Sequence, residues 1–481
     1  MQFIEEIKIL EQIASQLDPS PEQRAFWRNA VINHTESYLE NIYQVPAKIE
    51  LPEKASALLE SPIQEEPEEI DSLLTLIQKN VDEQGLKPSS PGYMAYIPGG
   101  GIYPTALGDY LAAIGNHYAG YFFASPGGVR MENMLISWVA EILGFDTSTI
   151  AGNLTSGGSF ATLIAIHTAR EAKKIKAVDI TRSVIYLTAQ THHAALKALR
   201  VTGLGEAIIR YIPMNETYQM DVEALREQVK SDQEQGLNPF MAIGSAGTTD
   251  TGAVDDLETL GKICRENHLW FHVDAAYGGF FALIDEIKPL FKGIKTCDSL
   301  VIDPHKGLFL SFGAGIVLVK DKTHLLEAHT SNASYLQDLV NDPSELSPAD
   351  LSPELSKHFR GMRMWLPLKL FGVKTFRAAL REKILLARYM YEEMKKIPGI
   401  ELGPYPMLSV FIWRHIPESG DINAHNQRLV KAIQDDGRVF LSSTMIGDDF
   451  YIRVAILHFR THLARVEVCL EVIRERVELP L

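Results

Sequence analysis

The chain has 481 residues, of which 46% are hydrophobic and 22% charged, a composition that is ordinary for a soluble globular protein. Its 46 basic and 61 acidic residues give a net charge of −15 with no basic block, which argues against nucleic acid and anionic membrane surfaces as partners. One simple core does not accommodate this length, so we expect a large domain with appended parts.

The three cysteines are an odd number and lie far apart, at Cys264, Cys297 and Cys469. This spacing favours neither a disulfide framework nor a zinc site, and it predicts a reducing, cytoplasmic location without a bound metal. We expect no signal peptide, because the first ten residues already contain the charged residues Glu5 and Lys8.

The N-terminal region is predicted to be helical. Ser20, Pro21 and Gln23 supply the cap, the first-turn proline and the glutamine three residues after the cap that are typical of a helix start. This helix should run until Pro46.

An extended connection rich in proline and glutamate should follow over residues 47–67, and a second helix should run from about Glu68 to near Gly85. These helices are amphipathic but too few to make a core of their own. We therefore expect a partner subunit or the main body of the protein to cover their apolar faces.

The segment Tyr110–Val129 carries no charged residue and is about long enough to span a bilayer. It also contains Asn116, His117 and the turn Pro126–Gly128, which a membrane helix would not favour. We interpret it as a buried segment that lines a pocket.

From about Gly152 short apolar runs, most of them with β-branched residues, alternate with helical segments. The expected strands are Val184–Leu187, Ala207–Ile212, Phe240–Gly244, Trp270–Val273, Leu300–Ile302 and Gly315–Val319. The expected helices are Phe160 to about Lys174, Asp221–Lys230 and Asp255–Asn267. This alternation predicts an α/β fold with a mostly parallel central sheet covered by helices.

A smaller α+β unit should follow after Lys374. Its expected elements are a helix to about Lys396, a strand at Leu408–Trp413, a helix at Ile422–Gln434, strands at Val439–Leu441 and Tyr451–Ile456, and a last helix from about Thr461. We therefore divide the chain into an N-terminal helical segment (1–88), a large domain (89–373) and a small C-terminal domain (374–481).

Two motifs at predicted strand ends carry the strongest functional signal. Lys306, in Asp-Pro-His-Lys-Gly, follows the apolar strand Ser299–Ile302, and Asp274, in His-Val-Asp-Ala-Ala, ends the strand before it. A pyridoxal phosphate (PLP) enzyme needs this pair, because the lysine holds the aldehyde as a Schiff base and the carboxylate keeps the pyridine nitrogen protonated.

Each of these residues also has a simpler interpretation. Most lysines lie on the surface, and Asp274 could cap a helix or bind a metal. However, Lys306 is followed by an apolar stretch, and no second carboxylate or histidine pair with metal spacing accompanies Asp274.

The turn Ser156-Gly157-Gly158-Ser159 stands before the helix predicted from Phe160. Glycines let backbone N–H groups approach a phosphate, and a helix N-terminus favours its negative charge. The turn is therefore a candidate phosphate site, although most such turns are only loops.

Two further residues are candidates for proton transfer. His192 follows the strand Val184–Leu187, where it is either a polar loop residue or an imidazole stacked on the cofactor ring. Tyr335 lies in the segment Ala328–Leu351, which is rich in Ser, Asn, Asp and Pro and is predicted to be a mobile loop. A tyrosine on such a lid could deliver a proton when the lid closes.

From about Pro91 to Arg460 the chain resembles the group II PLP-dependent amino-acid decarboxylases, which have the fold of the fold-type I PLP-dependent transferases. The matching segments are Pro91–Tyr93, Tyr103–Pro104, Ala124–Pro126, Thr155–Ser159, Thr191–His192, Gly247–Thr249, His272–Gly279, Asp303–Lys306, Arg453 and Phe459–Thr461. The combination of His-x-Asp-Ala-Ala with Pro-His-Lys is highly specific.

The resemblance assigns a role to each candidate residue. Lys306 would hold PLP, Asp274 would pair with the ring nitrogen and His192 would stack on the ring. The other cofactor contacts would be Ser156, Gly157, Gly158, Ser159, Thr248, Ala276 and His305.

The resemblance also implies the reaction, which is decarboxylation of an L-amino acid to an amine and CO2 through an external aldimine and a quinonoid. Tyr335 resembles the lid tyrosine that protonates the quinonoid carbon. Relatives with phenylalanine there tend to be oxidative aldehyde synthases, so the tyrosine favours decarboxylation. The family forms homodimers with active sites at the interface, which implies that residues 1–88 serve dimerisation.

Two departures from the family pattern leave the substrate open. Gly307 stands where many relatives have tryptophan, and Phe160 stands where an acidic or small polar residue is usual. A catalytically idle binding protein is the third hypothesis, but it would not need Lys306, Asp274 and His192 all in place.

We favour an aromatic amino acid as the substrate. The aromatic residues that either line its pocket or belong to the core are Tyr93, Tyr96, Tyr103, Tyr121, Phe122 and Phe123. An acidic substrate, such as glutamate or cysteine sulfinate, would instead need an arginine, for which Arg130, Arg360 and Arg453 are candidates.

Overall fold

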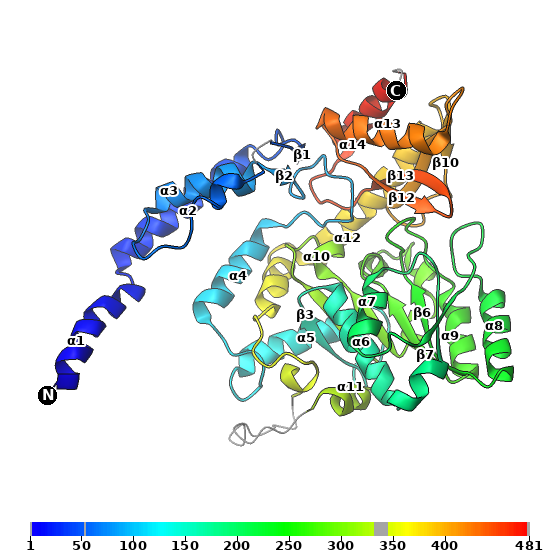
Figure 1. Cartoon of the computed structure of the whole chain (residues 1–481), viewed down its shortest axis with the longest axis horizontal. Coiled ribbons are helices and arrows are strands. Elements are labelled where there is room, and N and C mark those ends of the chain that lie inside the picture. Colours follow the sequence, from blue (N-terminus) through cyan, green and yellow to red (C-terminus); the bar gives the residue numbers. More distant parts are fainter. Residues whose placement is uncertain (1, 52–53, 331–344, 479–481) are drawn as a thin grey trace. The chain divides into compact units, whose positions relative to one another are not determined.

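The computed structural model describes residues 2–51, 54–330 and 345–478. The chain divides into two compact units, Met1–Pro91 and Gly92–Leu481, whose elements are labelled in Figure 1. None of the helices in the described ranges combines the length and the apolar character that crossing a membrane requires.

The first unit contains helices α1 (Gln2–Ala14), α2 (Pro21–Glu40) and α3 (Ile70–Ile77) and the antiparallel strands β1 (Lys48–Ile49) and β2 (Gly85–Leu86). The predicted start of α2 is confirmed, because Ser20 Oγ accepts a hydrogen bond from the N–H of Gln23 at 3.2 Å. The helix ends at Glu40 and not near Pro46. The predicted second helix is shorter than expected and continues as a π-helical turn over Gln78–Asp82.

Helix α1 leaves its apolar side chains exposed in this chain. Phe3, Ile7 and Leu10 have exposed fractions of 80%, 60% and 57%. An isolated helix of this length is marginally stable in water, so α1 needs a surface to pack against.

The central sheet of the second unit has the strand order β3-β9-β8-β7-β6-β4-β5 within the described residues. These strands are β3 (Ala151–Thr155), β4 (Ser183–Leu187), β5 (Ile208–Tyr211), β6 (Asn238–Ser245), β7 (Trp270–Asp274), β8 (Ser299–Ile302) and β9 (Gly315–Val319). Strands β5, β4, β6, β7 and β8 run parallel, whereas β9 is antiparallel to both of its neighbours, β8 and β3. The predicted mostly parallel sheet is confirmed.

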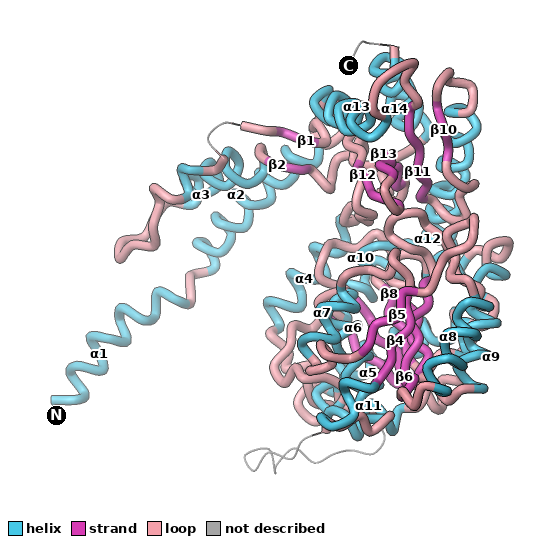
Figure 2. The backbone as a smooth tube through the Cα atoms, turned by 45° about the vertical axis from the view of Figure 1, so that its right-hand side comes forward, coloured by secondary structure: helices cyan, strands magenta, loops and turns pink. Residues whose placement is uncertain are grey.

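Helices cover both faces of this sheet, as Figures 1 and 2 show. They are α5 (Pro126–Ile142), α6 (Gly158–Ala172), α7 (Ala194–Val201), α8 (Val222–Glu234), α9 (Leu257–Glu266) and α11 (Lys322–His329). Ile316 and Leu318 of β9 belong to the core formed with α5, α8 and α9, whereas Val317 and Val319 belong to the core formed with α6, α7 and α11. Successive side chains of a strand point to opposite faces, so both faces of β9 require apolar residues.

The long helix α12 (Gly361–Met394) begins earlier than predicted, because the sequence placed its start after Lys374. Pro367 and Gly372 lie inside it and suggest a break. The backbone kinks at Gly372, where φ is 69°, and the helical hydrogen bonding resumes beyond it.

The C-terminal part of the unit has an antiparallel sheet with the order β10-β11-β13-β12. Its elements are β10 (Ile400–Leu402), β11 (Val410–His415), α13 (Ile422–Asp436), β12 (Ser442–Ile446), β13 (Asp449–Ala455) and α14 (Leu463–Val477). The predicted strand Val439–Leu441 is wrong, since β12 begins at Ser442. Phe440 instead exchanges backbone hydrogen bonds with Gly92 and Met94, at 2.9 and 3.0 Å.

The interpretation of Tyr110–Val129 as a buried, pocket-lining segment is also wrong. The segment spans the end of α4 (Tyr103–Gly115), a connection and the start of α5. Tyr110, Leu111 and Ile114 have exposed fractions of 55%, 49% and 71%. Helix α4 packs on α12 through one face only, so its other apolar face stays uncovered in the single chain.

Candidate active site

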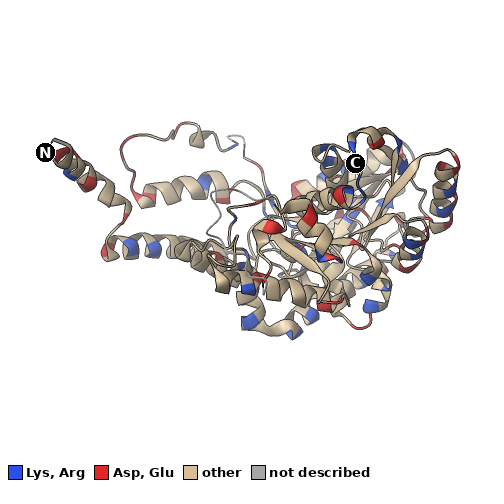
Figure 3. Ribbon diagram, turned by 90° about the horizontal axis from the view of Figure 1, so that it is seen from below, with Lys and Arg blue, Asp and Glu red and all other residues tan. Residues whose placement is uncertain are grey.

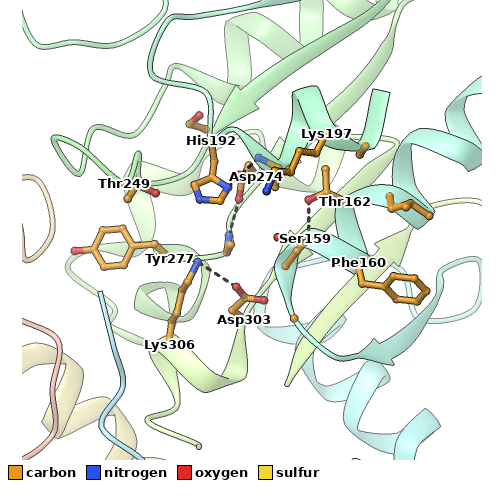
Figure 4. Close-up of a pocket in the computed structure, with 18 of the residues that line it drawn as sticks. Ser159, Phe160, Thr162, His192, Lys197, Thr249, Asp274, Tyr277, Asp303 and Lys306 are labelled. Carbon is orange, nitrogen blue, oxygen red and sulfur yellow. Dashed lines mark hydrogen bonds and ion pairs between the residues drawn. The ribbon is translucent and has the colours of Figure 1, made fainter. Parts of the chain in front are cut away.

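A cavity of about 460 Å³ lies at the edge of the sheet where β4, β6, β7 and β8 end and α6 begins. Figure 4 shows part of its lining. Every described residue that the sequence analysis assigned to the cofactor lines this cavity, namely Ser156, Gly157, Gly158, Ser159, His192, Thr248, Asp274, Ala276, His305 and Lys306. Tyr335 lies outside the described residues, so its place on a lid stays a prediction.

Lys306 is held in the cavity by a buried carboxylate. Strand β8 ends at Ile302, and the single helical turn α10 (Pro304–Gly307) follows it. This turn brings Lys306 Nζ within 3.1 Å of Asp303 Oδ2, as Figure 4 shows. The Asp303 side chain is 2% exposed and the Lys306 side chain 20%, so the ion pair is largely shielded from water.

Asp274 is the last residue of β7, the strand beside β8. It pairs with Val301 in the parallel register, and its Oδ1 atom accepts a hydrogen bond from the N–H of Ala276 at 3.0 Å. Asp274 and Lys306 therefore follow the ends of neighbouring parallel strands, as the sequence predicts.

His192 lies in the loop between β4 and α7 and contacts His193, with 4.2 Å between the ring centroids. Burial lowers the pKa of His192, and the nearby carboxylate of Asp274 opposes this effect. The N–H of Ala194 donates to Nδ1 at 3.3 Å. The neutral ring therefore carries its proton on Nε2.

The turn before α6 places two glycines at the start of this helix, on the cavity wall. Gly157 adopts a φ of 149°, and its N–H donates to Thr155 Oγ1 at 3.3 Å. Thr162 Oγ1 donates to the carbonyl of Gly158 at 2.7 Å and braces the first helical turn. A Cβ atom at Gly158 would lie 2.8 Å from Asp303 Oδ2, so this position needs glycine.

His305 is 8% exposed and lies beside the same carboxylate. Its Nδ1–H donates to the carbonyl of Ala314 at 2.5 Å, and its Nε2 lies 3.6 Å from Asp303 Oδ2. Burial lowers the pKa of His305, although Asp303 acts in the opposite direction. The imidazole is therefore neutral at pH 7, with Nε2 unprotonated.

The cavity also contains residues that the sequence analysis gave no role, namely Gln190, Lys197, Ser245, Thr249, Tyr277 and Asp303. Ser245 ends β6, so the strand-end argument used for Asp274 could have found it. Asp303 stood inside the lysine motif, but only the structure shows that its side chain turns back toward Lys306.

A chain of hydroxyl groups orders one wall. The N–H of Ala253 donates a hydrogen bond to Thr248 Oγ1 at 3.1 Å. This oxygen in turn lies 2.9 Å from Thr251 Oγ1. Thr251 in turn donates to Gln190 Oε1 at 2.8 Å. Thr248 therefore has a fixed orientation at the cavity.

The two departures from the family pattern have different structural settings. A Cβ atom at Gly307 would lie 2.7 Å from the Cβ of Phe280, so the buried ring of Phe280 takes the space of a larger side chain. Phe160 lines the cavity at the start of α6 and packs against the adjoining core.

Of the aromatic candidates, Tyr93, Tyr121 and Phe122 are buried, and Tyr96, Tyr103 and Phe123 are exposed. None of the six is among the residues that line the described cavity. The interpretation as core residues therefore fits the buried three.

The arginine candidates differ in their partners. Arg130 pairs with Glu345 at 3.3 Å, and Arg360 pairs with Glu354 at 3.4 Å. Arg453 is 3% exposed, and its Nε and Nη2 atoms have no hydrogen-bond partner among the described residues. Burial lowers the pKa of Arg453, with Asp250 as the main opposing charge.

A lysine, a carboxylate and a glycine-rich turn before a helix, all at one edge of a mostly parallel sheet, are the groups that a PLP-dependent enzyme needs. Residues 52–407 match the model of the pyridoxal-dependent decarboxylase conserved domain. An aromatic-L-amino-acid decarboxylase of Bacillus atrophaeus is 34% identical over 81% of this chain and 82% of its own. A phenylacetaldehyde synthase of Arabidopsis thaliana is 27% identical over 94% of this chain and 96% of its own.

Solved structures agree with this similarity. Tryptophan decarboxylase of Catharanthus roseus with L-tryptophan has a TM-score of 0.89 at 25% identity, covering 95% of this chain and 98% of its own. The Oryza sativa TDC with PLP and tryptamine has a TM-score of 0.90 at 23% identity, with the same coverage. The chain belongs to the pyridoxal-dependent decarboxylase family. It is a PLP-dependent amino-acid decarboxylase.

Proposed function

We propose that this protein removes the carboxyl group of an aromatic L-amino acid as CO2, with Lys306 and Asp274 at the centre of the reaction. The observation that carries the proposal is the position of these two residues in one cavity, at the ends of adjacent parallel strands. Bound PLP supplies the electron sink for the bond that breaks.

In this proposal each side chain has one task. Lys306 Nζ holds the aldehyde carbon of the cofactor, and Asp274 keeps the proton on the ring nitrogen. The amides of the turn Ser156–Ser159, with the N-terminus of α6, bind the phosphate. The neutral imidazole of His192 would cover one face of the ring and shield it from water, with its Nε2–H left as a hydrogen-bond donor.

Tyr335 is proposed to return a proton to the α-carbon of the substrate. The support is its place in Ala333–Leu336, which resembles the lid segment of decarboxylases. The Tyr335→Phe variant tests this role. We expect the amine product to fall and an aldehyde to appear, with oxygen consumed and ammonia and hydrogen peroxide released. An unchanged amine yield would remove Tyr335 from the reaction.

The proposed aromatic substrate rests on the relatives. Beside the Bacillus atrophaeus enzyme, tyrosine decarboxylase 2 of Arabidopsis thaliana is 29% identical over 82% of this chain. The test is mass spectrometry of products after the PLP-loaded protein meets a panel of L-amino acids. We expect an amine from an aromatic member and none with Lys306→Ala.

A second candidate, decarboxylation of an acidic amino acid, is favoured by Arg453. Two buried guanidinium nitrogens of Arg453 lack a hydrogen-bond partner in the part of the chain that the structure describes, and buried donors of this kind favour an anionic ligand. The Arg453→Met variant separates the two candidates. If the substrate is acidic, kcat/KM should fall by about 100-fold or more. For an aromatic substrate, the change should stay within about tenfold.

A third candidate, oxidative decarboxylation to an aldehyde, is represented among the relatives by phenylacetaldehyde synthases. Wild-type protein that consumes oxygen and releases hydrogen peroxide with the aldehyde would support it. Tyr335 favours the simple decarboxylase, so we expect the amine as the main product.

We also propose that the protein acts as a homodimer. Helix α4 presents a stripe of apolar side chains along one face, formed by Tyr103, Leu107, Tyr110, Leu111 and Ile114. A stripe of this kind marks a protein interface, and a second copy of this chain is the occupant that the family favours. Sedimentation should give twice the chain mass of 53.7 kDa, and Ile114→Asp should shift it toward one chain mass.

A cytoplasmic location is part of the same proposal. Its support is that Cys264, Cys297 and Cys469 are all buried free thiols, which a reducing compartment preserves. Fractionation of cells that express the full chain would test it. Recovery outside the cytoplasmic fraction would contradict it.

A further inference from the structure

The cavity that is proposed to take the cofactor has an unusual charge balance for an anion site. Two carboxylates line it, Asp274 and Asp303, together with two lysines, Lys306 and Lys197. His192 and His305 add no positive charge at neutral pH, because burial lowers the pKa of each imidazole. A phosphate dianion that enters this cavity therefore needs a cation that is not already neutralised.

Lys306 does not meet this need. Its ammonium group pairs with Asp303 at 3.1 Å, and the same nitrogen is the proposed point of attachment for the cofactor. The α6 N-terminus supplies only about half an elementary charge. A residue with a full positive charge would balance the remaining negative charge of the phosphate.

Lys197 is the remaining cation of the described lining. It lies on α7, which packs against α6, and Figure 4 shows its side chain on the side of the cavity where Ser159 and Thr162 lie. No carboxylate of the described residues lies within ion-pair distance of it. The ammonium group of Lys173, at the end of α6, differs because it already donates a hydrogen bond to the carbonyl of His268, at 2.7 Å.

The surroundings of Lys197 leave its side chain room to reach into the cavity. Ala194 and Ala198, its neighbours on α7, are 4% and 3% exposed and line the cavity beside it. Their small side chains leave room for the lysine stem, and Leu163 adds apolar surface from α6. The Lys197 side chain itself is exposed, so its contact with a phosphate would be sensitive to salt.

We propose that Lys197 is the counter-ion of the cofactor's phosphate group and reaches it from α7. This inference rests on the proposed phosphate position at Ser156–Ser159. Lys197 is then a cofactor-binding residue that belongs to no motif of the sequence analysis. The turn supplies hydrogen bonds, and the lysine supplies the charge.

The experiment compares two ligands that differ only in the phosphate, PLP and pyridoxal. Their dissociation constants are measured by absorption with wild-type protein, Lys197→Met and Lys197→Arg, each first freed of cofactor. We expect Lys197→Met to weaken PLP binding by about 10- to 100-fold and pyridoxal binding by less than about twofold. Lys197→Arg should keep most of the PLP affinity, since it keeps the charge.

Arg200→Met is the matched control, because it removes a positive charge from the same helix at a residue that does not line the cavity. It should leave both dissociation constants within about twofold. An equal loss for PLP and pyridoxal in Lys197→Met, or no loss for either, would overturn the inference. Failure of the wild-type protein to bind PLP would instead count against the proposed function.

Salt gives an independent readout. Because the contact is ionic, raising the salt concentration should weaken PLP binding to the wild type more than to Lys197→Met. Parallel salt dependences in the two proteins would contradict the role of Lys197. The folded state of each variant is checked by its unfolding midpoint, which should not move, because the Lys197 side chain is exposed.

Discussion

Asp303 Oδ2 lies 3.1 Å from Lys306 Nζ, and the two residues form an ion pair inside the proposed cofactor cavity. The pair spans one turn of backbone that begins at the end of β8. Because Asp303 is almost fully buried, its negative charge depends on the ammonium group of this lysine.

The first prediction concerns this pair in the cofactor-free protein. Asp303→Asn should lower the free energy of unfolding by about 1–3 kcal/mol, because it leaves the Lys306 ammonium group without its partner. Chemical denaturation of both single variants and of Asp303→Asn with Lys306→Met gives the coupling energy. We expect about 1–3 kcal/mol of coupling, and additive effects would show that the pair contributes nothing.

The second prediction concerns Asp274. Asp274→Asn keeps the shape of the side chain but removes its charge, so the proton on the cofactor's ring nitrogen is no longer stabilised. We expect kcat to fall by about 100- to 1,000-fold while PLP is still bound.

Asp221→Asn is the control for Asp274→Asn, because Asp221 caps α8 through the N–H groups of Glu223 and Ala224, and asparagine caps equally well. It should leave kcat unchanged. A loss of PLP in Asp274→Asn, measured by absorption, would instead assign Asp274 to cofactor retention.

The third prediction concerns stability at acid pH. His272 is fully buried on β7, with its Nδ1 atom 2.8 Å from Ser299 Oγ, and burial lowers its pKa from 6.5 to about 4. The unfolded chain therefore binds a proton below pH 6.5 that the folded chain takes up only near pH 4. The neutral His272 therefore imposes no penalty on folding above pH 6.5. As the pH falls to about 4, the free energy of unfolding decreases by about 3 kcal/mol in total.

Chemical denaturation between pH 7.5 and 4.5 measures this loss. His272→Gln should flatten the pH dependence by about one proton over this range. The exposed His117, replaced by glutamine, is the control and should leave the slope unchanged. Equal slopes for wild type and His272→Gln would contradict the prediction.

The fourth prediction concerns the glycine after the lysine. Gly307→Ala should destabilise the protein by about 1–3 kcal/mol, because the new Cβ would lie 2.7 Å from the Cβ of Phe280. The cost should be smaller in a Phe280→Gly background, where this Cβ atom is absent. Gly127→Ala is the control, since its Cβ would meet nothing within 4 Å. The same cost in both backgrounds would remove Phe280 as the cause.

The sequence alone determined the architecture and the key residues. Alternating apolar runs and helical segments predicted the mostly parallel sheet, since strands buried on both faces must be apolar throughout. The motifs around Asp274 and Lys306 were found because parallel strands present their carboxyl ends at one edge. The sequence was less reliable at boundaries. The part of α12 before the kink at Gly372 was missed because Pro367 and Gly372 are unfavourable inside a helix. Phe440 forms long-range hydrogen bonds with Gly92 and Met94 and lies outside β12.

Only the tertiary structure decided which charges meet. Asp303 and Lys306 are three residues apart, yet their contact depends on the turn that follows β8. Lys197 follows His192 by five residues, but its place in the cavity depends on how α7 packs against α6. Likewise, only the structure shows which face of α4 is exposed, because α12 packs against the opposite face. Local sequence patterns determine the helices and strands. Long-range packing determines which charged side chains lie close together and how well they are shielded from water.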